Sequence, residues 1–140
     1  MYRFFPVLVL CLLAGIRGTS AAESLAVYSD VCINKDSGDL NGMRLAIFRL
    51  GGAPYLVLQW ARSDSFEEPE LKKISPDDLS KGKMKFSTEY GKQLIQFSGT
   101  MTERVIIGTF DNRMFMKDYG YKIIQLRRVE ASQKRFGVCR

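Results

Sequence analysis

The chain has 140 residues, with 21 Lys and Arg, 15 Asp and Glu and no histidine, so its net charge is +6. This length suits one domain, and the dispersed basic charge argues against a nucleic-acid-binding protein, which carries a concentrated basic stripe with stacking aromatics. The lack of histidine excludes Ser-His-Asp and Cys-His nucleophile activation and most zinc sites. We therefore expect a protein that is not an enzyme and needs no cofactor or metal.

The first 22 residues differ in character from the rest of the chain. Arg3 precedes an apolar run over residues 4–16, and small residues fill positions 18–22, which is the pattern of a secretory signal peptide. The run is about 13 residues long and too short to span a bilayer, which takes roughly 20. We predict cleavage after residue 22, a single domain over residues 23–140 with a net charge of about +4, and a periplasmic or secreted protein without a membrane span.

The cysteines predict one disulfide. Cys11 lies in the predicted signal peptide, so the mature chain keeps only Cys32 and Cys139. Neither residue belongs to a Cys-x-x-Cys motif, and an exported protein meets an oxidising environment. We therefore predict a structural Cys32–Cys139 bridge, which in the chain-entropy treatment stabilises the fold by roughly 4–5 kcal/mol at most.

The first half of the mature chain is predicted to form short strands separated by turns. A strand over residues 25–33 is followed by a polar loop and then by two strands, 43–50 and 55–62, around the turn sequence Gly-Gly-Ala-Pro at 51–54. The two strands should form a hairpin. Residues 43–50 are apolar on both faces, which is typical of a strand in a curved sheet or between two layers.

The second half continues in the same way. Residues 63–70 form a predicted exposed loop, and Ser75 with Pro76 predicts a short helical turn near residues 76–80. A strand over 83–87 and a hairpin of 94–100 with 104–110 follow.

We interpret residues 113–119 as a loop or irregular edge, and residues 121–129 as the last long strand. About eight short strands joined by tight turns predict an all-β fold, a single antiparallel meander that closes into a small barrel or sandwich. The first and last strands would then be neighbours, which fits the predicted disulfide.

Three short segments resemble a known family. Residues 97–101 (Phe-Ser-Gly-Thr-Met), 106–111 (Ile-Ile-Gly-Thr-Phe-Asp) and 123–128 (Ile-Ile-Gln-Leu-Arg-Arg) are similar to the glycine-containing strands and basic last strand of small lipocalin-like, calycin-type barrel domains of bacterial exported proteins. The resemblance implies a β-barrel fold.

The acidic residues do not match the pattern of a calcium site or of a catalytic pair of carboxylates. The loop over residues 36–42 resembles a calcium loop, but Phe48 stands where a bidentate Glu is needed, so a backbone turn explains it better. A glycosidase needs two carboxylates with tuned pKa values, and five of the six candidates lie on predicted solvated loops. The six are Glu67, Glu68, Glu70, Asp77, Asp78 and Asp111.

Residues 113–121 form the best candidate binding segment, because methionines and aromatics gather where a polar turn is expected. The segment is either a loop at a barrel mouth that binds a ligand or partner, or a strand whose side chains pack in the core. Trp60 is likewise either a pocket wall or a core residue. The candidate binding residues are Trp60, Met114, Phe115, Met116, Tyr119 and Tyr121.

Two functions fit these patterns. The first is an exported, non-enzymatic binding module that holds a small apolar molecule in the barrel or an envelope component at its rim. The second is an inhibitor or interaction partner of a cell-envelope enzyme that acts through its loops. In either case we expect a monomer that binds no nucleic acid.

Overall fold

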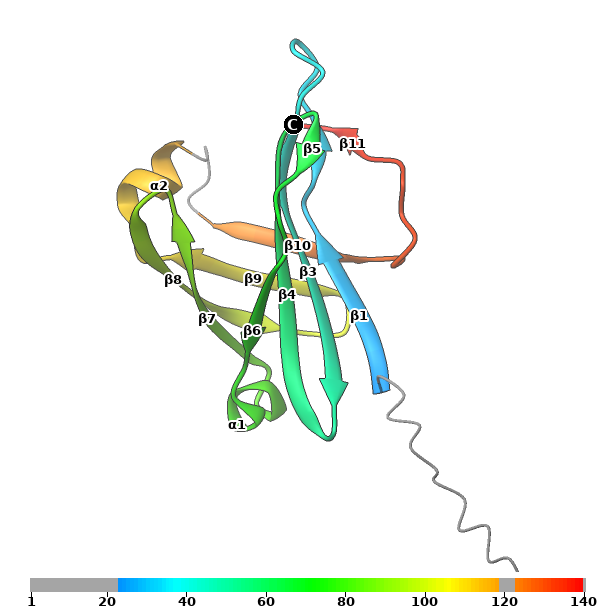
Figure 1. Ribbon diagram of the computed structural model, residues 1–140, viewed down its shortest axis with the longest axis vertical. Helices are drawn as coiled ribbons and strands as arrows, with labels where there is room; N and C mark the ends of the chain where they lie inside the picture. The colour runs from blue at the N-terminus through cyan, green and yellow to red at the C-terminus, as the bar shows by residue number, and fades with distance from the viewer. Residues whose placement is uncertain (1–22, 119–122, 140) are drawn as a thin grey trace, which may run out of the picture.

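The structure is a computed structural model that describes residues 23–118 and 123–139, so the predicted signal peptide lies outside the described residues. The chain folds into an antiparallel sheet that curls into a half-barrel (Figure 1). The strands are β1 (Glu23–Ser29), β2 (Cys32–Ile33), β3 (Leu40–Leu50), β4 (Ala53–Ser63), β5 (Ser65–Phe66), β6 (Glu70–Lys73), β7 (Lys83–Tyr90), β8 (Gln93–Met101), β9 (Val105–Phe110), β10 (Ile124–Val129) and β11 (Gly137–Val138), and the helices are α1 (Pro76–Ser80) and α2 (Arg113–Asp118).

Eight of these strands form the body of the sheet, in the order β6-β4-β3-β1-β10-β9-β8-β7. Strands of this body that follow one another in the chain pair with each other, except that β6 and β7 do not pair and form its two edges, whereas β1 pairs with β10, where Val27 faces Val129. The predicted all-β antiparallel meander is therefore confirmed, and so is the predicted contact between its first and last strands.

The β3–β4 hairpin shows how the sequence builds the two faces of the sheet. Alternation directs Leu45 and its partner Leu58 to the inner face, where both are fully buried. Phe48 and Tyr55 lie opposite each other on the outer face, with ring centroids 5.9 Å apart. The strand that is apolar on both faces thus belongs to a curved sheet, as predicted.

A pair of glycines allows the sheet to curl tightly at β8 and β9. Gly99 and Gly108 lie opposite each other on the inner face, and a Cβ atom at Gly108 would collide with the ring of Phe97. Phe97, which is fully buried, stacks on Phe86 at 4.9 Å. The glycines of the family-like segments therefore have a packing role, which is to make room for an aromatic ring.

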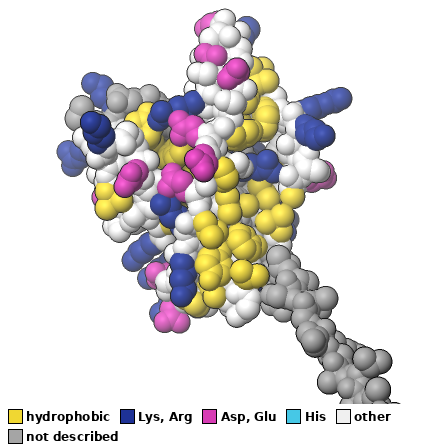
Figure 2. Space-filling view, in the orientation of Figure 1, with side chains coloured by type: hydrophobic (Ala, Val, Ile, Leu, Met, Phe, Trp, Pro, Cys, Tyr) yellow, Lys and Arg dark blue, Asp and Glu magenta, His cyan; other side chains and the backbone are white. Residues whose placement is uncertain are grey.

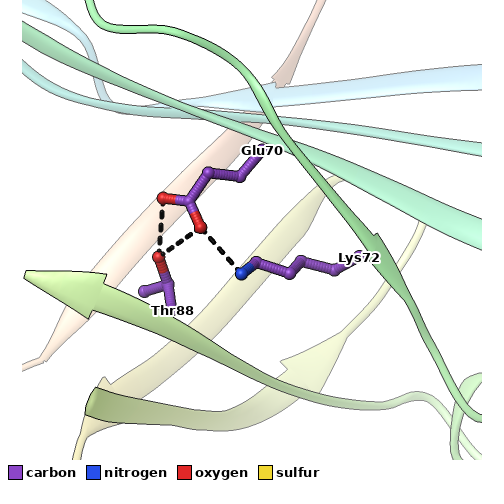
Figure 3. A network of polar contacts seen from close by, with 3 residues as sticks. All are labelled: Glu70, Lys72 and Thr88. Carbon is purple, nitrogen blue, oxygen red and sulfur yellow. Dashed lines mark hydrogen bonds and ion pairs between the residues drawn. The ribbon is translucent and has the colours of Figure 1, made fainter.

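The open edges of the half-barrel, β6 and β7, are linked by side chains. Glu70 on β6 accepts a hydrogen bond from the hydroxyl of Thr88 on β7, whose oxygen lies 2.8 and 2.9 Å from the two carboxylate oxygens. Lys72 Nζ lies 2.7 Å from the same carboxylate (Figure 3). Thr88 is fully buried, so its hydrogen bond to a charged partner satisfies a hydroxyl that water cannot reach.

The structure corrects two of the predicted elements. Residues 113–119 were expected to be a loop or irregular edge, but residues 113–118 form α2. The predicted loop over residues 63–70 contains the short strand β5, and β6 begins at its end and pairs with β4. The helical turn at α1 is confirmed, and Ser75 caps it by accepting a hydrogen bond from the backbone N–H of Asp78.

The C-terminal tail returns across the outer face of the sheet. Cys139 is bonded to Cys32, 107 positions away, which confirms the predicted disulfide. β11 pairs with β2 in parallel, and Phe136 packs against Phe66 with ring centroids 5.9 Å apart. The tail thus covers the end of the outer face that lies near the disulfide.

Reduction of the disulfide should destabilise the protein without unfolding it. The core packs independently of the bridge, so we expect the free energy of unfolding to fall by a few kcal/mol, with roughly 4–5 kcal/mol as a ceiling. Urea unfolding with and without dithiothreitol measures the change. The double variant Cys32→Ala/Cys139→Ala should be as stable as the reduced protein, and dithiothreitol should not change its stability. Loss of the far-UV sheet signal on reduction would contradict the prediction.

Candidate functional site

Residues 113–118 of the predicted binding segment form the short helix α2, which contributes side chains to the core. Asn112 caps the helix, because its Oδ1 accepts a hydrogen bond from the backbone N–H of Phe115 at 3.1 Å. Phe115 is 3% exposed and Met116 is 7% exposed. These two side chains are therefore core residues and do not form an exposed recognition surface. The side chain of Met114, and Tyr119 and Tyr121, lie outside the described part of the chain.

Phe115 closes one end of the half-barrel with an aromatic cluster. Its ring centroid lies 4.6 Å from that of Tyr90, 4.9 Å from that of Phe110 and 5.6 Å from that of Trp60. The guanidinium of Arg62 lies 4.6 Å above the Tyr90 ring, which adds a cation–π contact at the surface of the cluster. Trp60, at 3% exposure, is thus a core residue of this end.

The inside of the curled sheet is filled by the chain's own side chains, as small barrels allow. Residues from seven strands, α2 and the segment after β6 form one cluster, and its members are at most 7% exposed. They are Tyr28, Met43, Leu45, Ile47, Leu56, Leu58, Trp60, Ile74, Met84, Phe86, Ile95, Phe97, Ile106, Phe110, Phe115, Met116, Ile124 and Leu126.

The opposite end, next to α1, holds a pocket of about 280 Å³. Leu79 of α1 and Met101 of β8 pack against the edge of the core there. The Tyr28 hydroxyl donates a hydrogen bond to the carbonyl of Thr102 at 2.9 Å, which holds its ring in place. We call this the rim pocket; it is lined by Ala26, Tyr28, Ile47, Phe48, Arg49, Leu79 and Met101.

A second pocket, of about 360 Å³, lies beside the disulfide and contains Asp30 and Arg127. Asp30 follows β1, and its Oδ1 accepts a hydrogen bond from the backbone N–H of Met43 at 2.7 Å. Gly42 has a φ of 117°, and a Cβ there would lie 2.7 Å from Asp30 Oδ1. The glycine therefore gives the carboxylate room to reach the β3 backbone.

Burial raises the pKa of Asp30 to about 6, although the hydrogen bond from Met43 acts in the opposite direction. The carboxylate is thus the one described acidic side chain here with a clearly raised pKa, and it has a structural partner. The geometry indicates a clamp between the end of β1 and β3 rather than a catalytic acid.

The rim pocket was not predicted from the sequence. Its lining comes from β1, β3, α1 and β8, and only the strand order brings these segments together. Leu79, the apolar residue of a predicted helical turn, was the one local signal. Asp30 was also missed, because it lies within the strand predicted over residues 25–33, where a single acidic residue gives no local sign of burial.

Comparison with known proteins gives no relative. No protein-family description, no curated protein and no solved structure matches the chain. In the described residues, no helix is long and apolar enough to span a bilayer. The disulfide is consistent with an oxidising compartment outside the cytoplasm.

Truncation of Phe115 should cost stability. Because its ring contacts three other aromatics in the core, Phe115→Ala is expected to lower the free energy of unfolding by roughly 3–5 kcal/mol. Urea denaturation measures the loss, and Lys117→Ala, at an exposed position of the same helix, should leave stability nearly unchanged. A Phe115→Ala protein as stable as the wild type would show that this end of the core is not packed as described.

Asp30 should make the protein more stable in mild acid. Its pKa is higher in the folded state, about 6, than the ordinary 3.8, so between these pH values the folded protein binds more protons than the unfolded one. The contribution of Asp30 to stability therefore falls as pH rises through this window, by roughly 3 kcal/mol at most. Asp30→Asn removes this dependence, which urea unfolding at pH 4, 5, 6 and 7 (about one unit apart) would measure. The exposed variant Asp36→Asn should keep the wild-type profile; an unchanged profile in Asp30→Asn would refute the assignment.

Proposed function

We propose that this protein is a non-enzymatic binding module that holds an apolar group in the rim pocket. The observation that carries the proposal is that the half-barrel is filled inside, while its apolar inner face reaches the surface next to α1. Small-molecule sites are mostly apolar concavities with a few polar groups, and the rim pocket has this composition.

The size of the pocket limits the ligand. Its volume of about 280 Å³ is near the lower end of ligand sites, which span roughly 300–1,000 Å³. A short acyl chain or a single ring fits such a space, with the polar remainder of the ligand outside. This favours an envelope component bound at the rim over a molecule enclosed in the barrel.

The proposal also includes the compartment of the protein and its evolutionary relation to other barrels. The signal-like residues 1–22 and the disulfide support a periplasmic or secreted protein. The up-and-down order of the eight strands and the paired glycines of β8 and β9 support a distant relation to lipocalin-like barrels. We expect the protein to act as a monomer.

Filling the rim pocket should abolish binding of a small apolar probe. Ala26→Phe places a ring in the pocket, so we expect the affinity for a single-ring apolar probe, toluene, measured by NMR titration, to fall about tenfold or more. Ala131→Phe is the matched control, because Ala131 is exposed and lies outside the pocket. It should bind as the wild type does.

A second variant distinguishes the loss of the pocket from a folding defect. Leu79→Ala removes an apolar wall from the half-buried side of α1 and should weaken probe binding about threefold to tenfold while the sheet stays intact. Unchanged affinity in both pocket variants would overturn the proposal. Native mass spectrometry of the protein from its own host would then identify a retained natural ligand.

A further inference from the structure

The outer face of β1, β3, β4 and β6 carries an uncovered apolar surface. One row of directly paired residues crosses the four strands; it begins at the buried Val27, continues through the half-buried Ala46 and Val57, and ends at the exposed Leu71. A second row, nearer the β3–β4 turn, contains the stacked pair Phe48 and Tyr55. We define the outer apolar patch as Leu25, Phe48, Leu50, Tyr55, Val57 and Leu71.

The leucines of this patch are strongly exposed. Leu71 is 62% exposed, Leu25 51% and Leu50 48%. Figure 2 shows the hydrophobic side chains gathered over the lower part of β3 and β4. Single exposed apolar residues are ordinary, but a contiguous group usually marks an interaction surface.

The structure shows where the patch ends. The next row across the sheet is polar, since Ser29 lies opposite Arg44 and Arg44 lies opposite Gln59. Beyond it the C-terminal tail covers the face, and Arg44 donates a hydrogen bond to the carbonyl of Ala131. The tail therefore protects one end of the outer face and leaves the apolar end open.

The charged side chains that share the outer face with the patch are positive. On the outer face of the strands that carry it, the described charged side chains are Arg44 and Lys73, and Lys73 lies directly opposite Tyr55. Arg127 follows on the neighbouring β10, opposite Ser29. Glu70 and Lys72 belong to the inner face, at the seam with β7.

We propose that the outer apolar patch docks on an anionic lipid surface. Leucines, Phe48 and Tyr55 would enter the interface between headgroups and acyl chains, and the basic residues would contact lipid phosphates. Charge selects this occupant, because a basic protein is attracted to anionic lipid. A second copy of the same chain would bring like charges together, which opposes a dimer through this face.

Vesicle co-sedimentation tests the proposal. The purified protein should bind vesicles of phosphatidylcholine with about a quarter phosphatidylglycerol, bind pure phosphatidylcholine much less, and dissociate as salt is added. Leu71→Glu and Leu50→Glu should each lower the partition coefficient about tenfold or more. Leu94→Glu is the matched control, since Leu94 is 73% exposed on β8, away from the patch, and should bind as the wild type does.

The charge requirement has its own pair of variants. Lys73→Gln should weaken binding to the anionic vesicles about fivefold, whereas Lys92→Gln, at an exposed turn position, should have a smaller effect. All variants have the same N-terminal sequence, so a difference in vesicle binding between two variants is caused by the substituted residue.

Four results would overturn the proposal. These are no binding to anionic vesicles, equal loss in Leu71→Glu and Leu94→Glu, a dimer in light scattering that Leu71→Glu dissociates, and a patch-dependent complex with a protein but not with vesicles. The Ala26→Phe variant separates this proposal from the rim-pocket function. It should lose the apolar probe and keep vesicle binding.

Discussion

The pairing of β1 with β10 is the constraint on which the rest of the structure depends. It joins segments from near the two ends of the described chain, with Val27 opposite Val129, so its loop-closure entropy is larger than that of any other pair among the eight strands in the body of the sheet. The disulfide acts on the same closure, because Cys32 and Cys139 follow these two strands. The β1–β10 pairing and the disulfide therefore both stabilise the contact between the two ends of the described chain.

This closure also decides how the curled sheet ends. With β1 and β10 paired in the middle, the free edges fall on β6 and β7. Exposed edges invite pairing with other chains, and here Glu70 and Thr88 link the two edges through side chains. The seam keeps the inner face closed enough for the aromatic core to exclude water, although no backbone ladder joins the two described edge strands.

The local parts of the fold were predictable because each has a local cause. Gly51 and Gly52 between alternating apolar residues predict the β3–β4 hairpin, and Ser75 followed by Pro76 predicts α1. The disulfide followed from the cysteine count and the expected compartment. In all these cases the sequence within a few residues, or the chemistry of one residue type, was sufficient.

The parts that failed depend on distant partners. β6 contains one apolar residue, Leu71, and exists as a strand because β4 offers it a backbone edge. For residues 113–121, the density of methionine and aromatic residues left two interpretations open, a binding loop or a strand packed in the core. The described part is a helix, and Asn112 was the overlooked helix-capping signal. Phe115 is buried because its ring fills the opening at the end of the half-barrel, and only the complete topology defines this opening.

The rim pocket and the outer apolar patch meet at Phe48, which lines the first and belongs to the second. Neither surface contributes to the stability of the monomer in proportion to its apolar area, because hydrophobic free energy is gained only where water is removed. The C-terminal tail covers the outer face near the disulfide, where Arg44 donates a hydrogen bond to the carbonyl of Ala131, and it leaves Leu25, Leu50 and Leu71 exposed. The two proposed surfaces therefore use opposite faces of β1 and β3, the inner face for the pocket and the outer face for the patch, and they share Phe48 alone.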